Sequence, residues 1–414
     1  METIEDVVIV GAGIAGLTTA LGLHRHGIRS LVLESSATMR ITGFAFSTWT
    51  NAWKALDAIG IGDSLRKHHL LLDGVTVSSV VSGQTVQELS FYDTSEGEPR
   101  VREIRCMKRK ELLEALGKEL PSGTIRYSAK VVSIEESGYL KVLHLVDGTV
   151  IKTKVLIGCD GVNSVVAKWL GLNPASFSGR SGIRGYVDLK SAHGFPPKFQ
   201  QFIGNGIRAG FIPCDDQCVY WFFTWTPSTQ DKDVEDNPAK MKELVSRKLE
   251  VIPENVRMAL ESTDLDSIQL AHLRYRQPWE LLWGSISKGN VTVTGDALHP
   301  MTPDLGQGAC SALEDGIVLA RCLSEAMKSQ GSTAEATEDE MRKEYQRIVM
   351  ALQKYAKERR WRSFDLVSTS LVNGLIQQST GKVVSFLRNR FLGKHIAGLL
   401  MKKSDFECGN LTTA

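Results

Sequence analysis

The sequence has few of the features that mark membrane-spanning, nucleic-acid-binding or disordered proteins. Its apolar runs all fall short of the roughly 20 residues that cross a bilayer. Lys and Arg number 49 against 47 Asp and Glu, a balance too even for a bulk attraction to nucleic acid. Only 12 prolines occur and 42% of the residues are hydrophobic, which excludes a disordered or collagen-like chain. At 414 residues, the sequence predicts a globular protein with more than one packed unit.

The cysteines of the sequence predict neither a disulfide framework nor a metal site. The seven cysteines are odd in number and scattered, which favours buried thiols in a reducing compartment. Cys214 and Cys218 lie close together, but no second Cys or His pair follows at the spacing of a zinc site. The first residues show no signal or transit pattern. We therefore expect a cytoplasmic protein without a bound metal.

A dinucleotide-binding pattern is present near the N-terminus. The apolar run Val7–Val10 predicts a strand buried on both faces, and Gly11–Gly16 follows it at once as G-x-G-x-x-G. Residues 17–27 then predict a helix, and residues 30–33 predict a second strand that ends at Glu34. This order of strand, glycine turn, helix and acidic residue predicts a dinucleotide site.

Each part of this pattern has a physical role. Gly11 permits a tight turn, Gly13 lets the backbone approach a pyrophosphate, and Gly16 lets helix and sheet pack closely. Glu34 can accept hydrogen bonds from ribose hydroxyls and argues against a 2′-phosphate, hence against NADP at this position. FAD and NAD both fit the motif.

Two later strand patterns end in acidic residues. Residues 154–159 predict a buried strand that leads into Asp160-Gly161 and a short helix. Residues 290–294 predict another strand, which delivers Gly295-Asp296. A glycine-rich turn then opens a helix over 310–328, and its unpaired N–H groups suit the negative charge of a reduced flavin.

These three motifs, in this order, resemble the class A flavoprotein monooxygenases of the para-hydroxybenzoate hydroxylase fold. The resemblance covers nearly the whole chain and is strongest to the salicylate-hydroxylase-like and zeaxanthin-epoxidase-like branch, especially its plant members. It implies FAD as cofactor, with Asp296 on the ribityl chain, Asp160 serving flavin and pyridine nucleotide, and Arg109 of an Arg-x-x-Leu element contacting FAD. The backbone near Val131 is similar to the family's adenine contact. The cofactor-binding positions are Gly11, Gly13, Ile14, Ala15, Gly16, Glu34, Ser35, Arg109, Val131, Asp160, Asp296, Pro303, Gly306, Gln307, Gly308 and Ala309.

The resemblance also implies the reaction. NAD(P)H, as a transient co-substrate, would reduce FAD, and O2 would add to give a flavin C4a-hydroperoxide. One oxygen atom would then hydroxylate or epoxidise a small aromatic or isoprenoid substrate, with the protein supplying orientation and exclusion of water. Two alternatives stay open: an NAD(P)H oxidase-like flavoprotein, and a flavin-bound regulatory or binding protein without turnover. The Trp221 to Trp225 segment does not match the Trp-x-Trp-x-Ile-Pro element of flavin halogenases.

Three residues on the predicted sheet that faces the flavin are the catalytic candidates. They are Arg184, Tyr186 and Arg208, because a phenol needs a base and a substrate carboxylate needs a cation. A structural role is the alternative for each. His299 is expected to shape the loop after Asp296, and Phe44 is expected either to fill core or to reshape the space beside the flavin.

The predicted fold is α/β, a Rossmann-like FAD domain with an inserted antiparallel β-sheet substrate domain and C-terminal helices. The FAD domain comprises residues 1–74, 101–178 and 285–335, the substrate domain 75–100 and 179–284, and the C-terminal helical region 336–414.

Four further segments carry local expectations. The string at residues 204–210 resembles a second nucleotide fingerprint, but its context predicts a hairpin turn. Residues 231–260 predict a charged surface helix. Residues 338–361 predict a long helix whose Arg-rich end resembles a family element, with a solvated face for most of its charges. The basic stretch 383–403 predicts either a packed amphipathic helix or a contact with a membrane surface.

Overall fold

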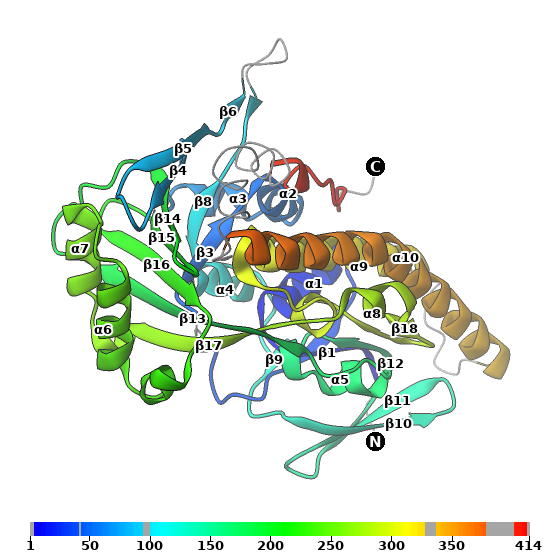
Figure 1. The fold of residues 1–414 in the computed structure, drawn as a ribbon. Coiled ribbons are helices and arrows are strands. Elements are labelled where there is room, and N and C mark those ends of the chain that lie inside the picture. The colour runs from blue at the N-terminus through cyan, green and yellow to red at the C-terminus, as the bar shows by residue number, and fades with distance from the viewer. Residues whose placement is uncertain (1–3, 41–42, 94–99, 328–336, 378–400, 412–414) are drawn as a thin grey trace.

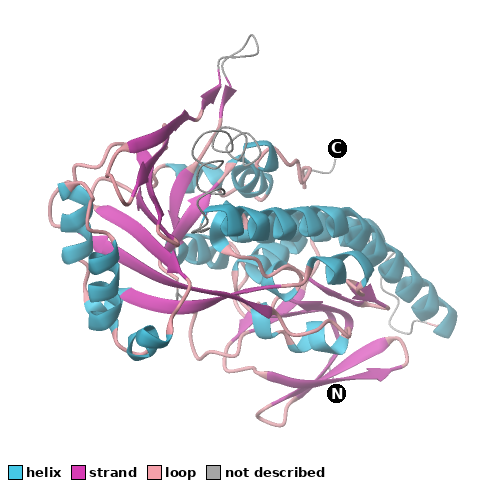
Figure 2. Cartoon of the chain, in the orientation of Figure 1, coloured by secondary structure: helices cyan, strands magenta, loops and turns pink. Residues whose placement is uncertain are grey.

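The computed structural model describes residues 4–40, 43–93, 100–327, 337–377 and 401–411. Two large β-sheets lie side by side, with helices packed around them (Figure 1). Figure 2 shows the strands at the centre of the molecule and helices toward both sides. This architecture confirms the predicted α/β class with a second sheet added to a Rossmann-like unit.

The first sheet contains the dinucleotide-type unit. Its order is β10-β11-β12-β1-β2-β9, and β19 pairs with β12 and β18. The β12–β1, β1–β2, β2–β9 and β12–β19 pairs are parallel. The carboxyl ends of β1, β12 and β19 therefore meet at one edge, which brings their following turns together. The strands are β1 (Ile4–Val10), β2 (Ser30–Leu33), β9 (Ile125–Arg126), β10 (Val131–Ser137), β11 (Leu140–Leu145), β12 (Val150–Gly158), β18 (Ser287–Lys288) and β19 (Val291–Val293).

The second sheet has the order β17-β13-β16-β15-β14-β4-β5. It is antiparallel, as predicted, except at one pair, because β4 and β14 run parallel. The exception arises because β4 and β5 come from a hairpin far upstream in the chain, which adds to the edge of the sheet. The strands are β4 (Gly74–Ser79), β5 (Thr85–Ser90), β13 (Ser176–Asp188), β14 (Lys198–Gly204), β15 (Ile207–Pro213), β16 (Cys218–Trp225) and β17 (Ile268–Tyr275).

The two faces of the second sheet bury different groups. Ile183, Phe211, Trp221 and Phe223 form a hydrophobic core with α6 and α7, which cover the outer face (Figure 1). Because side chains alternate along a strand, the even-numbered positions of β13, β15 and β16 face the first sheet. That inner face forms a wall of the candidate site.

Helices cover the first sheet, and α1 packs against α9, which in turn packs against α10. The helices are α1 (Ile14–Arg25), α2 (Thr50–Ala58), α3 (Gly62–Arg66), α4 (Arg109–Lys118), α5 (Val165–Trp169), α6 (Pro238–Lys248), α7 (Glu254–Glu261), α8 (Pro278–Trp283), α9 (Gly308–Met327) and α10 (Glu338–Gln377). The shorter strand pairs are β3 (Ala45–Thr48) with β8 (Arg105–Lys108), and β6 (Tyr92–Asp93) with β7 (Arg100–Val101). In the described ranges, no helix is both long and apolar enough to cross a membrane.

Several local expectations can be compared with the structure. The hairpin between β14 and β15 is confirmed, with Asn205 and Gly206 at positive φ in its turn. The single helix expected over 231–260 is instead two helices. Helix α6 ends at Lys248 and α7 begins at Glu254, directly after Pro253, and both contribute to the hydrophobic core. Helix α10 runs 40 residues, well past the expected end at Trp361. The predicted domain boundaries remain a prediction.

Two expectations concern cysteines and the C-terminus. All seven cysteines are free and buried, as predicted. The basic stretch 383–403 lies almost wholly outside the described residues, which resume at Met401.

Candidate active site

The turn after β1 has the close packing that its glycines predict. Gly11 has φ +103°, and a Cβ there would lie 2.5 Å from the carbonyl oxygen of Cys159. A Cβ on Gly16 would lie 1.9 Å from the carbonyl oxygen of Gly11. A Cβ on Gly13 would contact nothing within 4 Å. Gly11 and Gly16 therefore permit close backbone packing that a side chain would prevent. Gly13 instead leaves an open cradle, a space without protein atoms, at the N-terminus of α1.

Glu34 closes one side of this turn. Its Oε2 accepts a hydrogen bond of 2.9 Å from the backbone N–H of Ala12, and its Oε1 accepts one of 2.9 Å from the N–H of Ser36. The carbonyl of Glu34 accepts from the N–H of Ala129, two residues before β10 starts at Val131. The exposed Ser35 and the start of β10 thus lie beside the turn, although none of Glu34, Ser35 and Val131 lines the main cavity.

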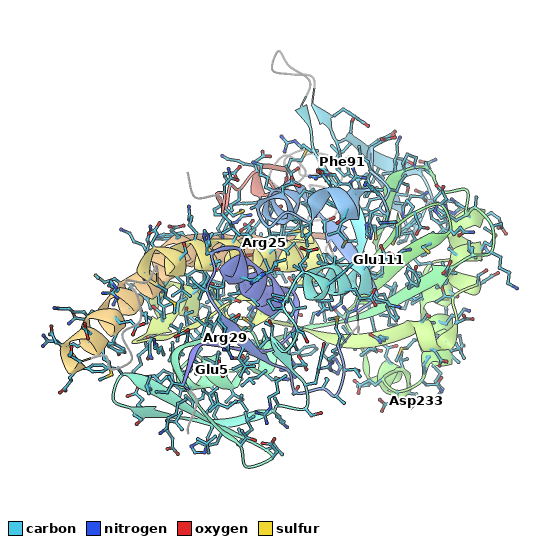
Figure 3. The ribbon with its side chains drawn as sticks, turned by 180° about the vertical axis from the view of Figure 1, so that it is seen from behind. Glu5, Arg25, Arg29, Phe91, Glu111 and Asp233 are labelled. Atoms are coloured by element: carbon cyan, nitrogen blue, oxygen red, sulfur yellow. The ribbon has the colours of Figure 1, made fainter. Side chains whose placement is uncertain are left out.

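A cavity of about 570 Å³ lies between the two sheets. It brings the N-terminal motif together with residues almost 300 positions later in the chain, from the 3₁₀ turns Gly295–Ala297 and Pro303–Leu305 and from the first turn of α9. Phe91, labelled in Figure 3, also lines it and contacts the ring of Trp49. The predicted cofactor residues that line the cavity are Gly13, Ile14, Ala15, Arg109, Asp296, Pro303, Gly306, Gly308 and Ala309.

Arg109 and Asp296 form an electrostatic pair in this cavity. Arg109 begins α4, and its buried Nε has no hydrogen-bond partner among the described residues. Burial lowers the pKa of Arg109, an effect that Asp296 opposes. Asp296 is itself exposed at the cavity. An unpaired buried donor beside the open cradle at Gly13 fits a polar cofactor that spans both positions.

Two predicted cofactor residues use their side chains elsewhere. The carboxylate of Asp160 accepts from the hydroxyl of Ser164 (2.5 Å), the N-cap residue of α5, and from the N–H of Val165 (2.7 Å), so it is engaged at the start of α5. Burial raises the pKa of Asp160, and the next two residues line the cavity in its place. The side chain of Gln307 turns away from the cavity and accepts a hydrogen bond from Asn51 (2.8 Å). Any cofactor contact by Gln307 would therefore come from its backbone.

The second sheet contributes cationic and aromatic groups to the opposite wall. Arg184 and Arg208 line the cavity together with Tyr220 and Phe222. Only 4% of Arg208 is exposed, and its Nε and Nη1 have no hydrogen-bond partner among the described residues. Burial lowers the pKa of Arg208, although the nearby Asp304 opposes this shift.

Asp304 lies between two arginines. Arg180 donates to both of its carboxylate oxygens, at 3.0 and 2.7 Å, whereas Nη1 of Arg208 is 3.7 Å from Oδ1. Asp304 therefore orients Arg208 electrostatically without occupying its hydrogen-bond donors.

Tyr186, the third catalytic candidate, does not line the cavity. Its ring stacks on Phe44 at a centroid distance of 6.4 Å, and burial raises the pKa of its hydroxyl. Its cross-strand partner Tyr220 lines the cavity instead, on the strand β16. Burial raises the pKa of Tyr220 to about 12.

Tyr220 and Asp304 were missed as candidates in the sequence. The alternation of side chains along β16 places Tyr220 on the same face as Phe222, but it does not show which strands pair with β16. Phe44 has φ +54° and packs on Tyr186 without lining the cavity, which fits the expectation that it fills core.

The comparisons with known proteins agree with this geometry. The FAD binding domain family matches residues 5–353 of the chain. The chain belongs to this family, and it is an FAD-dependent monooxygenase. It is 53% identical to Monooxygenase 2 of Arabidopsis thaliana over 410 residues, which cover 99% of both chains. FAD is therefore its cofactor, as predicted.

More distant relatives share the fold. The chain is 28% identical over 324 residues to an FAD-dependent urate hydroxylase of Mycolicibacterium vanbaalenii, covering 76% of this chain and 78% of that one. The crystal structure of Klebsiella pneumoniae HpxO complexed with FAD and uric acid has a TM-score of 0.81 at 22% identity, covering 99% and 98% of the two chains. This structural match confirms the overall architecture of a flavin monooxygenase.

Proposed function

We propose that this flavoprotein uses NAD(P)H and O2 to place one oxygen atom on a small, planar, anionic aromatic substrate that Arg208 binds. The observation that carries the proposal is the state of Arg208. Arg208 is a buried residue in the lining of the cavity that also has to hold FAD, and two nitrogens of its guanidinium have no hydrogen-bond partner among the described residues.

The chemistry of this wall favours an aromatic anion over an isoprenoid. A buried donor left unpaired costs about 1–3 kcal/mol, so an apolar isoprenoid seated here would leave that cost in place. A carboxylate or an ionised heterocycle would accept a charge-assisted hydrogen bond from the guanidinium of Arg208. The guanidinium lies 4.9 Å from the ring centroid of Phe222, and Phe199 contacts the same ring. These two rings, which meet edge to face, provide an apolar aromatic surface for the body of an aromatic substrate.

Each group then has a separate part in the reaction. FAD, when bound, supplies electron transfer from NAD(P)H and the activation of O2. Arg208 binds the anion and Asp304 orients Arg208. Tyr220 stays protonated at neutral pH because of its raised pKa, so it can donate a hydrogen bond to the substrate. The sequence relative named for urate hydroxylation and the structural relative with bound uric acid act on or bind a planar heterocycle of this chemical kind.

The test is anaerobic reduction of the bound flavin by NADH and by NADPH, followed through the loss of flavin absorbance. A panel would contain aromatic acids, phenols, anionic heterocycles and isoprenoids. We expect an aromatic anion to accelerate reduction and, with O2, to yield a product one oxygen atom heavier. Acceleration by isoprenoids alone would overturn the substrate class. Consumption of NAD(P)H with hydrogen peroxide as the only product, for every compound, would favour the oxidase alternative.

A further inference from the structure

A cluster of four charged residues, three of them fully buried, lies between α9 and α10. Glu314 and Asp315 on α9 face Arg359 and Arg362 on α10, and we call these four residues the α9–α10 charge cluster. Arg359 donates to Asp315 Oδ1 from Nε (2.6 Å) and to Glu314 Oε2 from Nη2 (2.7 Å). Arg362 donates to Glu314 Oε1 at 2.7 Å. Glu314, Asp315 and Arg359 are fully buried, so Arg359 is an exception to the solvated helix face that the sequence predicted.

The charges of the cluster balance and remain ionised. Burial opposes ionisation of both carboxyls, but the arginines hold the pKa of Glu314 below its usual value. His299 and Arg359 do the same for the pKa of Asp315. Two carboxylates and two guanidinium groups therefore neutralise one another inside the protein.

The two carboxylates also accept hydrogen bonds that connect them to the turns lining the cavity. Asp315 Oδ2 accepts from the backbone N–H of Gly295 and from His299 Nε2, each at 2.7 Å. Gly295 is the residue before Asp296, which faces the cavity. The Asp315 side chain thus fixes the turn that presents Asp296.

Glu314 reaches the second turn through Asn51. The amide nitrogen of Asn51 donates to Glu314 Oε1 (2.5 Å) and to the side-chain oxygen of Gln307 (2.8 Å). Gln307 is followed by Gly308, which starts α9 and lines the cavity. Asp315 is therefore bonded directly to one cavity-lining turn, and Glu314 is linked to the other through Asn51. Among the described residues, only Arg359 donates to both carboxylates.

Stability alone is a weak reason for this arrangement. Removing four charges from water is expensive, and apolar replacements of buried ion pairs are often as stable. What apolar side chains cannot reproduce is the set of directed hydrogen bonds to Gly295, His299 and Asn51.

We propose that Arg359 is a positioning residue of the flavin site. By binding Glu314 and Asp315 together, it sets the relative placement of the turn at Gly295–Asp296 and the turn at Gln307–Gly308. The proposal concerns the cofactor that the family membership establishes and is independent of the substrate class proposed above.

The test compares Arg359→Met and Arg359→Lys with two control variants. Arg360→Met is the matched control, because Arg360 is the next residue on α10 and, within the described part of the chain, its guanidinium donates to the carbonyls of residues 281, 282 and 284 at α8. Leu260→Ala removes core packing under the second sheet and controls for lost stability. The readouts are the Kd of the apoprotein for FAD, the visible circular dichroism of the bound flavin and its midpoint potential.

We expect Arg359→Met to raise the Kd for FAD by about tenfold or more and to alter the dichroism and the potential. Arg359→Lys should recover part of each change, because it keeps the charge but not the two-carboxylate fork. Arg360→Met and Leu260→Ala should leave the Kd within about threefold of the wild type, even where they lower the thermal stability.

The proposal is overturned if Arg359→Met lowers thermal stability while the Kd, dichroism and potential match those of the controls. If Arg359→Met does not fold, Asn51→Ala decides the matter. That variant breaks the connection from Glu314 to Gln307 and keeps every ion pair of the cluster. A changed dichroism and potential in Asn51→Ala would support the proposal, and unchanged values would refute it.

Discussion

The two ends of the cavity are built in opposite ways. At the end formed by Gly11–Gly16, the chain is contiguous and the carboxylate of Glu34 is paired with backbone N–H groups of Ala12 and Ser36. At the end formed by the second sheet, Arg208 is buried with two donor nitrogens unpaired among the described residues. The carboxylate at the first end is thus satisfied by backbone groups of nearby residues, whereas the guanidinium at the second end keeps donors without a hydrogen-bond partner among the described residues. Under the function proposed above, a substrate anion would supply an acceptor at the second end.

The largest effect should come from a substitution at Gly16, in the glycine turn after β1. In Gly16→Ala the new Cβ would lie 1.9 Å from the carbonyl oxygen of Gly11, a backbone atom that cannot move without opening the turn. We expect a loss of about 3 kcal/mol or more in the free energy of unfolding and no retained FAD, measured by urea unfolding and flavin absorbance.

Gly13→Ala is the matched control for that variant, because its Cβ would meet no atom within 4 Å. Its apoprotein should unfold within about 0.5 kcal/mol of the wild type, while its affinity for FAD falls because the methyl group occupies the cradle. Equal losses of stability in the two variants would contradict the roles assigned to the two glycines.

The next effect concerns the end of the cavity that the second sheet forms. Arg208→Met should weaken binding of the anionic substrate by roughly 10- to 100-fold, because charge-assisted hydrogen bonds to a buried guanidinium are lost. Its apoprotein should be as stable as the wild type or more so, since the variant removes a buried cation whose nearest carboxylate oxygen is 3.7 Å away. The substrate Kd and the thermal midpoint check both statements, and a strongly destabilised apoprotein with unchanged substrate affinity would show that Arg208 is structural.

A smaller effect, which appears only in alkali, should come from Tyr220. A tyrosine in an unfolded chain has a pKa near 10, and burial raises that of Tyr220 to about 12. The group is neutral in both states below pH 10, so its contribution to stability is intact there. As the pH rises from about 10 to about 12 the unfolded state releases its proton first, and the contribution, up to roughly 3 kcal/mol, is lost.

Tyr220→Phe should therefore lose less free energy of unfolding across that pH window than the wild type does. Urea unfolding at a series of alkaline pH values measures the difference. Parallel curves for the two proteins would contradict the raised pKa.

The smallest effect should come from Phe44→Gly. Glycine relieves the left-handed backbone at φ +54°, and the variant also loses the ring that stacks on Tyr186. These opposite changes should leave the free energy of unfolding within about 1 kcal/mol of the wild type. The visible spectrum of the flavin should not change, because Phe44 packs outside the cavity. A shifted spectrum would show that its ring borders the flavin after all.

Much of the end formed by Gly11–Gly16 could be predicted, because its structure depends on residues that lie close together in the sequence. The glycine spacing, the apolar run before it and the acidic residue after the second strand require a dinucleotide turn whatever the rest of the chain does. The strand ends at Asp160 and Asp296 could also be predicted, although the Asp160 carboxylate accepts hydrogen bonds from Ser164 and Val165 at the start of α5.

The other end was only partly predictable. Arg184 and Arg208 were identified by residue type and strand alternation, and the structure places both at the cavity. Tyr186 was also a candidate, but its cross-strand partner Tyr220, which was not, lines the cavity in its place. Which of two paired side chains reaches a cavity depends on the segments packed against the sheet, and no single strand encodes that.

The sequence by itself determined the fold class, the cofactor and the turn that receives it, since these follow from short-range patterns and from an order of motifs that the family shares. Only the tertiary structure decided which side chains meet across the cavity and that Arg359 lies buried between two carboxylates. Both depend on contacts between segments far apart in the chain, such as β15 with the turn at Asp304 and α9 with α10. These contacts bury apolar surface and pair opposite charges between segments, which no single segment can do alone.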